Sequence, residues 1–327
     1  MEFAAGHDGG TIRAIRFAVV ALVLFLAQFL VPEAAFEPLN RVTAIMAAEL
    51  LGLMGRHAQA AGTLVRLDGF SARVVTECSV INPAILFISF VFGFAAPLRA
   101  KAAGILAGIP ILNSINVLRI AAVIATGAAV PALFEAVHVY VGQILMVGVV
   151  LFGAILWSRW ASADGVATFP FVPGVLAWSV ILFVPWLFMN RWYVAVGDIP
   201  LRLLFEMAGR PVELPVERPL YYQTFNSVLF ASLVLATGSI PIRRKAVFLA
   251  GGLALLAVGH QLFRVCNILF SAFGIRKAYL ASVAIHEISG YLLPFLLWFI
   301  LCHRKSRPSA HRQRSAEKDC READPPG

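Results

Sequence analysis

The stretch RVVTECSVINPAILFISFVFGFAAPLRAK, residues 73–101, places a cysteine at the start of a long apolar run that ends in a short basic turn. The run is long enough to cross a bilayer as a helix, since a helix rises ~1.5 Å per residue and the hydrocarbon core is ~30 Å thick. Similar runs recur along the chain, whose 327 residues are 60% hydrophobic and only 14% charged. A soluble domain carries ~25% charged residues, so the sequence predicts an all-α integral membrane protein.

Eight apolar runs are predicted to be transmembrane helices. They cover residues 14–32, 79–96, 102–130, 139–157, 170–189, 224–240, 246–273 and 287–303. The first run resembles a secretory signal, but it is long and a poor cleavage site follows it, so we interpret it as an uncleaved span. Residues 40–55 have the apolar period of a helix and are predicted to lie along the outer membrane surface.

The charges of the connections predict the orientation. Three short connections are basic, and so are both ends of the chain; the connections are PLRAK (97–101), SRW (158–160) and PIRRK (241–245). The positive-inside rule therefore places both termini in the cytoplasm and the longer segments 33–77 and 190–223 outside. The sequence predicts a multi-pass protein of the cytoplasmic (inner) membrane.

The net charge of +9 comes largely from these connections and from the C-terminal tail, residues 304–327. The tail has no apolar period, so we interpret it as a disordered cytoplasmic segment and expect no nucleic acid as a partner. The four cysteines, Cys78, Cys266, Cys302 and Cys320, show no CxxC or metal-ligand spacing. Neither a disulfide framework, nor a metal site, nor a cofactor is predicted.

The chain contains an internal repeat. APLRAKAAGILAG near residue 100 matches IPIRRKAVFLAGG near residue 244, Arg119 matches Arg264, and His138 matches His286. The three matches keep their order at an offset of about 144 to 148 residues, which is typical of a duplicated unit. Each unit holds four spans, and an even number gives parallel repeats. The predicted division is 1–165, 166–303 and the tail 304–327.

Polar side chains interrupt the third run. Asn113, Asn116 and Arg119 recur at intervals of three and so share one broad helix face. An arginine inside a span usually faces protein or water, because a charge in hydrocarbon is costly. Arg119 lies ~27 Å along the helix from Lys101, and therefore close to the outer interface. Asn113 is interpreted as a contact between helices.

Cys78, Arg119 and His138 are thus expected at one depth in the membrane, near its outer surface. The same topology puts Cys78 and His138 at the outer ends of their spans, level with Arg119. A thiolate is the nucleophilic form of cysteine, a histidine can accept its proton, and an arginine can lower the thiol pKa or stabilise an oxyanion. The set is suited to peptide cleavage or transpeptidation. At the repeat offset of about 144 residues, the position that corresponds to Cys78 is Tyr222. The second unit therefore lacks the thiol.

The motifs TECS, NVLR and AVHVYVG, in that order and at outer span ends, resemble the exosortase/archaeosortase family of membrane cysteine transpeptidases. The resemblance covers about residues 60–157 and implies that Cys78 is the nucleophile, Arg119 and His138 its catalytic partners, and Asn116 a supporting residue. Cys78 is followed by Ser-Val where the family often has Ser-Gly, which leaves the subfamily open. The second unit looks like a degenerate copy, with Gln261 in place of the motif asparagine. Arg264 and His286 are interpreted there as structural or substrate-orienting residues.

The resemblance implies partners as well. Substrates would be membrane-anchored proteins whose C-terminal tail carries a recognition motif, a hydrophobic helix and a basic cluster. Cys78 would cleave near the motif at the outer surface of the bilayer and form a thioester. A second nucleophile, namely water, an amine or a hydroxyl group, would resolve it.

Two other classes of function stay open at this point. Parallel repeats with polar residues in the membrane are also typical of secondary transporters, whose sites lie near the midplane. A non-catalytic scaffold for membrane-anchored proteins is the third reading. In both, Cys78 would be a structural thiol and Arg119 would extend to the headgroups. His260 is interpreted as a core or interfacial residue in every case.

Overall fold

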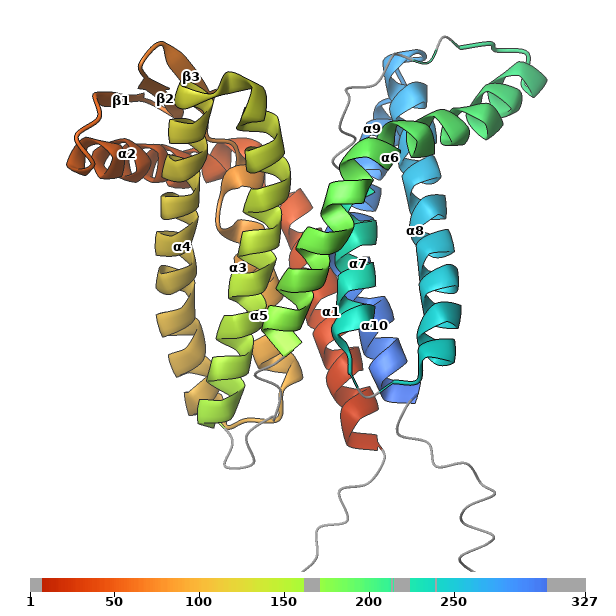
Figure 1. Ribbon diagram of the computed structural model, residues 1–327, viewed down its shortest axis with the longest axis horizontal. Coiled ribbons are helices and arrows are strands. Elements are labelled where there is room, and N and C mark those ends of the chain that lie inside the picture. The colour runs from red at the N-terminus through yellow and green to blue at the C-terminus, as the bar shows by residue number, and fades with distance from the viewer. Residues whose placement is uncertain (1–7, 162–170, 213, 215–223, 239, 305–327) are drawn as a thin grey trace, which may run out of the picture.

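The computed structural model describes residues 8–161, 171–212, 214, 224–238 and 240–304. Most of these residues are helical (Figure 1). The helices are α1 (Asp8–Leu30), α2 (Glu37–Leu53), α3 (Ile81–Gly93), α4 (Leu98–Ala129), α5 (Gly142–Ala161), α6 (Phe171–Met207), α7 (Phe225–Ala236), α8 (Ile242–Ser271), α9 (Arg276–Glu287) and α10 (Leu293–Arg304). The predicted boundary at residue 165, the tail 305–327 and Tyr222 lie outside the described residues.

The described helices make the chain a multi-pass membrane protein. Four of them are long and apolar enough to cross a membrane alone, namely Leu98–Ala129, Pro131–Ala161, Pro173–Met207 and Ile242–Ser271, and two bent pairs raise the number to as many as six. Each of the eight predicted ranges overlaps a helix, but α3 and α7, which belong to neither bent pair, have only 13 and 12 residues. At ~1.5 Å per residue these two are shorter than the hydrocarbon core, so eight spans stay a prediction.

The expectation of an all-α chain is wrong between residues 58 and 73. Three short strands, β1 (Ala58–Ala61), β2 (Leu64–Leu67) and β3 (Phe70–Arg73), form an antiparallel sheet in the order β1-β2-β3. The turn between β2 and β3 is Asp68-Gly69, with φ of 49° and 82° at the two residues. Positive φ at both turn positions is the geometry of the tight hairpin that Asp-Gly favours.

The sheet and α2 form a cap at one end of the bundle. Val65 and Leu67 of β2 pack with Leu51 of α2 and Ile124 of α4 in one buried cluster. The chain bends by 103° between α1 and α2, so α2 lies across the bundle, as a helix on the membrane surface would (Figure 1). A small open sheet has unpaired edge groups that hydrocarbon cannot satisfy. The cap is therefore the end of the molecule that lies outside the hydrocarbon.

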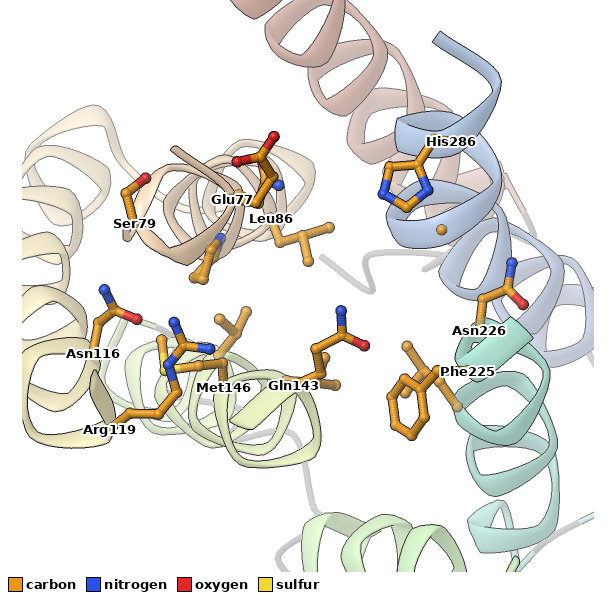
Figure 2. A pocket seen from close by; sticks show the side chains of 16 residues that line it. Glu77, Ser79, Leu86, Asn116, Arg119, Gln143, Met146, Phe225, Asn226 and His286 are labelled. Carbon is orange, nitrogen blue, oxygen red and sulfur yellow. The ribbon is translucent and has the colours of Figure 1, made fainter. Parts of the chain in front are cut away.

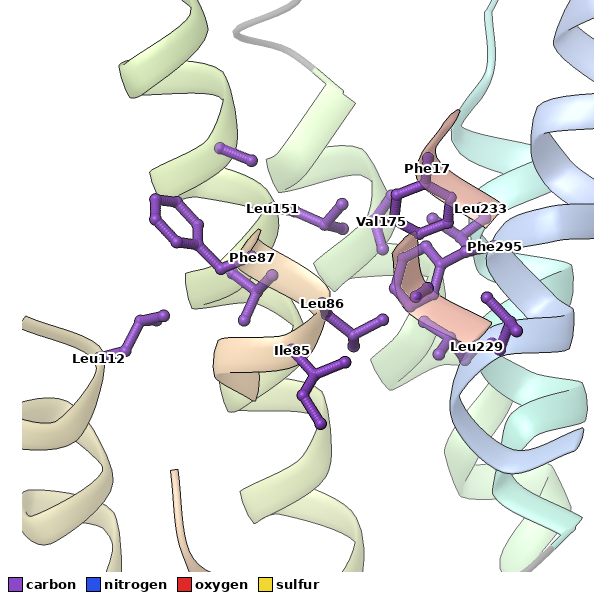
Figure 3. Close-up of a cluster of buried hydrophobic side chains, with 14 of the residues drawn as sticks. Phe17, Ile85, Leu86, Phe87, Leu112, Leu151, Val175, Leu229, Leu233 and Phe295 are labelled. Carbon is purple, nitrogen blue, oxygen red and sulfur yellow. The ribbon is translucent and has the colours of Figure 1, made fainter. Parts of the chain in front are cut away.

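The main core joins the two halves of the chain. Phe17 of α1 packs in one buried cluster with Leu86 and Phe87 of α3, Leu229 of α7 and Phe295 of α10 (Figure 3). Because α1 contacts both α3 and α10, it belongs to the seam between the halves. Burial of large apolar side chains at this seam fixes how the halves face one another.

Some local contacts recur in both halves. A Cβ at Gly108 would meet the ring of Phe87, and one at Gly252 would meet the ring of Phe230 in the same way. Lys101 donates to the carbonyl oxygen of Phe92 at 3.3 Å, and Lys245 to that of Leu235 at 2.9 Å. The matched positions are about 143 to 144 residues apart, which favours the predicted repeat.

Candidate active site

Cys78 lies at the end of a short 3₁₀ turn, Thr76–Cys78, just before α3 begins. The Oγ of Ser79 donates to the carbonyl oxygen of Thr76 at 2.6 Å, which closes the turn. The Sγ atom of Cys78 is 3.1 Å from Nε2 of His138. The predicted convergence of these two residues, 60 positions apart, is therefore present in the structure.

His138 belongs to a π-helical segment, Ala136–Val141, that precedes α5. Its ring stacks on that of Phe134, with centroids 5.4 Å apart, and Phe134 in turn contacts Phe70 of β3 at 5.0 Å. A Cβ at Gly127 would overlap both phenylalanine rings, so the glycine makes room for them on α4. The sheet that the sequence did not predict thus supports the imidazole through two aromatic rings.

Arg119 and Asn116 converge on the same residue, but on its backbone. Nη2 of Arg119 donates to the carbonyl oxygen of Cys78 at 2.8 Å, and Nδ2 of Asn116 donates to it at 3.0 Å. Arg119 is 8% exposed and Asn116 is fully buried. Their spacing of three puts both on one face of α4. The observed contacts make them the two residues that hold the backbone beside the thiol.

Burial raises the pKa of the Cys78 thiol, and the positive charge of Arg119 opposes that rise only in part. Cys78 is 8% exposed, and burial penalises the charged form of any group. The thiol is therefore protonated in the resting site at neutral pH. The imidazole at 3.1 Å is in hydrogen-bonding range to accept the proton when the thiol reacts.

A cleft of about 860 Å³ opens beside the thiol. Its described lining residues differ between the two halves of the chain. The charged ones come from the N-terminal half, namely Arg73, Glu77, Arg119 and Glu135. The side chains from α8 and α9 are uncharged or imidazole, namely Phe263, Asn267, Tyr279, Ser282, Val283 and His286. The cleft therefore has one charged, reactive wall and one largely neutral wall.

A narrower cavity of about 60 Å³ adjoins this region between α3, α4, α5 and α7 (Figure 2). It shares four lining residues with the large cleft, namely Glu77, Arg119, Gln143 and His286. Apolar side chains, among them Leu86, Met146, Val150 and Leu229, form much of the rest of its lining. Glu77 and Gln143 are not among the predicted site residues, although Glu77 precedes Cys78 and Gln143 follows the AVHVYVG motif.

The two predicted site residues of the C-terminal half, His286 and Arg264, lie in different places. His286 lines both cavities, opposite Arg119. Arg264 is buried, forms an ion pair with Asp198 of α6 and also donates to the carbonyl oxygen of Val194. Gln261 and Arg264 line neither of the two cavities. The structure thus brings the histidine, but not the arginine, to the Cys78 cleft.

His260 is a core residue, which is one of the two environments predicted for it. It is 2% exposed and hydrogen-bonded through both ring nitrogens, to the hydroxyl of Tyr193 at 2.8 Å and to Oδ1 of Asn226 at 2.9 Å. Asn226 completes the network by donating to the carbonyl oxygen of Ser289. Buried polar groups with satisfied hydrogen bonds rigidify a fold, so this network stabilises the C-terminal half.

Within the described part of the chain, no three His, Cys, Asp or Glu side chains gather as metal ligands would.

Residues 4–154 match the family model described as transmembrane exosortase (Exosortase_EpsH), a range that contains Cys78, Asn116, Arg119 and His138. The match confirms the family resemblance of the N-terminal half. No curated protein matches the chain, and no solved structure matches it.

The first prediction concerns the proton acceptor of the thiol. In His138→Ala, alkylation of Cys78 by iodoacetamide at pH 7 should slow by about tenfold, equivalent to one unit of thiol pKa. Because burial raises that pKa, the thiolate fraction grows as the pH rises, so the rate should recover at alkaline pH. His57→Ala, at an exposed position just before β1, is the control. A His138→Ala rate equal to wild type at pH 7 would contradict the assignment.

The second prediction concerns Gly142. A Cβ at Gly142 would lie 3.1 Å from Nη1 and 3.3 Å from Cδ of Arg119, whereas one at Gly153 of the same helix would make an ordinary 3.6 Å contact with Phe87. Gly142→Ala should displace the guanidinium and destabilise the protein by about 1 kcal/mol. Gly153→Ala should leave stability unchanged or raise it. Thermal unfolding in detergent measures both, and equal effects would argue against the packing role of Gly142.

Proposed function

We propose that this chain, whose residues 4–154 belong to the transmembrane exosortase family, removes a C-terminal sorting tail from membrane-anchored proteins through a Cys78 thioester. The family consists of membrane proteases and transpeptidases that act on substrates with such C-terminal signals. The tail would carry a recognition motif, a hydrophobic helix and a basic cluster. The observation that supports the proposal most directly is the 3.1 Å contact between Cys78 Sγ and His138 Nε2.

The reaction would proceed in two steps. His138 accepts the thiol proton, and the thiolate attacks the carbonyl carbon of the scissile peptide bond. The C–N bond then breaks, and the leaving amine of the tail takes the proton from the imidazolium. This leaves a thioester on Cys78, which water, an amine or a hydroxyl group on an acceptor would resolve, with His138 as the base.

Arg119 and Asn116 would act in this scheme by fixing the nucleophile. Their hydrogen bonds to the Cys78 carbonyl hold the turn that carries the thiol. The guanidinium charge also lowers the pKa of that thiol, against the effect of burial. A nucleophile held in reacting geometry has less entropy to lose in the transition state. No cofactor enters this chemistry.

The site would lie at the outer face of the cytoplasmic (inner) membrane. The basic connections at residues 97–101, 158–160 and 241–245 support this orientation by the positive-inside rule. The sheet packs at the Cys78 end of the bundle and must lie outside the hydrocarbon, which supports a position of the site at a membrane surface. A tail helix held in the bilayer would present its motif at this level.

The second unit, residues 166–303, would form the opposite wall of the substrate cleft as a degenerate repeat. The recurring Gly–Phe and Lys–carbonyl contacts support the duplication. The place of His286 in both cavities supports a role in orienting the substrate. Arg264 would act at a distance, by holding α6 to α8 through Asp198. The family match favours this function over a transporter or a non-catalytic scaffold.

The third prediction tests the nucleophile. In cells that make a membrane-anchored protein with such a tail, Cys78→Ala should leave the tail in place, because no other residue of the site can form the thioester. Cys266→Ala, a half-buried cysteine of α8, should process the tail as the wild type does. The mass of the substrate on a gel measures the outcome. Equal processing by all three proteins would eliminate the proposed function.

The fourth prediction separates the two residues of the second unit. His286→Gln should slow tail removal at an unchanged protein level, because His286 lines the cleft. Arg264→Gln should lower the protein level, because it leaves the Asp198 carboxylate without its partner at a cost of about 3 kcal/mol. The double variant Arg264→Gln/Asp198→Asn should regain much of that level. Immunoblots of membranes beside the processing assay give both readouts, and full activity of His286→Gln would contradict its role.

A further inference from the structure

Acyl transfer to a thiol creates a negative oxygen that the resting site must be prepared to receive. When the thiolate attacks a carbonyl carbon, the C=O π electrons move to the oxygen, and preorganised donors stabilise that oxyanion. In the resting site, Arg119 and Asn116 each already use one N–H donor. Arg119 Nη2 and Asn116 Nδ2 both bond to the Cys78 carbonyl oxygen. A further donor that faces the cleft would complete the site.

Gln143 is placed to be that donor. It is half-buried and is one of four residues that line both the large cleft and the narrow cavity. Figure 2 shows its amide in the open middle of the narrow cavity, between Arg119 and the α7 side of the pocket. Among the residues that the structure describes, no hydrogen-bond partner of this amide is found. Its two N–H donors therefore point toward space that a substrate would fill.

The backbone around Gln143 explains this position. Gln143 directly follows Gly142, whose missing side chain makes room for the guanidinium of Arg119. It also follows His138 by one π-helical turn, since a π-helix bonds residue i to residue i+5. The extra residue in this turn puts the histidine and the glutamine on one side of the helix. The imidazole and the amide thus belong to one continuous helical segment.

We propose that the side-chain amide of Gln143 donates a hydrogen bond to the oxyanion that forms when Cys78 attacks a carbonyl, an inference that rests on the proposed function. The Sγ–C bond forms, and the π electron pair moves to the oxygen, which Nε2–H of Gln143 stabilises. The pair returns as the C–N bond breaks, and the leaving amine takes the proton from His138. The carbonyl oxygen of the substrate therefore lies toward α5 when the thioester forms.

Two small electrophiles separate this role from a structural one without any knowledge of the sorting motif. p-Nitrophenyl acetate acylates a thiol through an oxyanion, whereas iodoacetamide alkylates it by displacement at a CH₂ group and forms none. The full chain in detergent is treated with each probe, and the rate found for Cys78→Ala is subtracted. In Gln143→Leu, the Cys78-dependent release of p-nitrophenol should fall by about 10²-fold. Alkylation by iodoacetamide should stay at the wild-type rate.

Two further variants sharpen the result. Gln143→Glu keeps the size of the side chain but loses the donors, so it should lose acylation as Gln143→Leu does. Gln261→Leu, a glutamine of α8 outside both cavities, should leave both rates unchanged. Wild-type acylation in Gln143→Leu would overturn the proposal. An equal fall with both probes would also overturn it, because Gln143 would then act through the thiolate or the packing.

The same experiment distinguishes a failure of this proposal from a failure of the proposed function. If Cys78→Ala reacts with both probes as fast as the wild type, Cys78 is not a reactive thiol and both proposals fall. If the Cys78-dependent rates are present but Gln143→Leu does not change acylation, only the oxyanion role of Gln143 is lost.

Discussion

Two side chains of α4 donate to one backbone oxygen, the carbonyl of Cys78, and the arrangement of the site follows from this pair of hydrogen bonds. A buried guanidinium is costly unless hydrogen-bonded, and a carbonyl in a short turn before a helix needs a donor. The guanidinium of Arg119 and the carbonyl oxygen of Cys78 each supply the hydrogen-bond partner that the other needs. Because the turn is only Thr76–Cys78, holding its last carbonyl also fixes the direction of the thiol. Cys78 is positioned through its backbone, and its thiol stays available for His138.

His138 depends on parts of the molecule that are far apart in the sequence. The ring of Phe134 supports it, and Phe70 of the sheet supports Phe134. The π-helical segment presents the ring to the thiol, and Gln143, in the first turn of α5, lines the cavity. The cap outside the membrane is thus part of the site, because it holds the imidazole at the level where Cys78 leaves the bilayer. A bundle of helices alone would lack this support.

The sequence predicted the helical ranges and the meeting of Cys78, Arg119 and His138, because apolar runs and charged connections are strong signals in a membrane protein. It did not predict the sheet, because strands of four residues carry almost no periodic signal and only the Asp68-Gly69 turn indicates a hairpin. It also did not predict that Arg119 bonds to a carbonyl. Spacing tells which residues share a helix face, whereas the choice between a thiol and a backbone oxygen depends on tertiary geometry.

The position of Arg264 follows from the same constraint, namely that a buried guanidinium needs a hydrogen-bond acceptor. In the first unit, Arg119 has the Cys78 carbonyl as a partner. The cysteine has no counterpart in the second unit, where the repeat offset reaches a tyrosine, yet Arg264 is still buried in α8. A buried cation needs a partner, and Asp198 of α6 supplies a carboxylate. Arg264 thus connects α8 to α6 through this ion pair, while His286 lines the cleft. On the proposed duplication, the first unit would have kept the thiol and the second would have become the neutral wall that faces it.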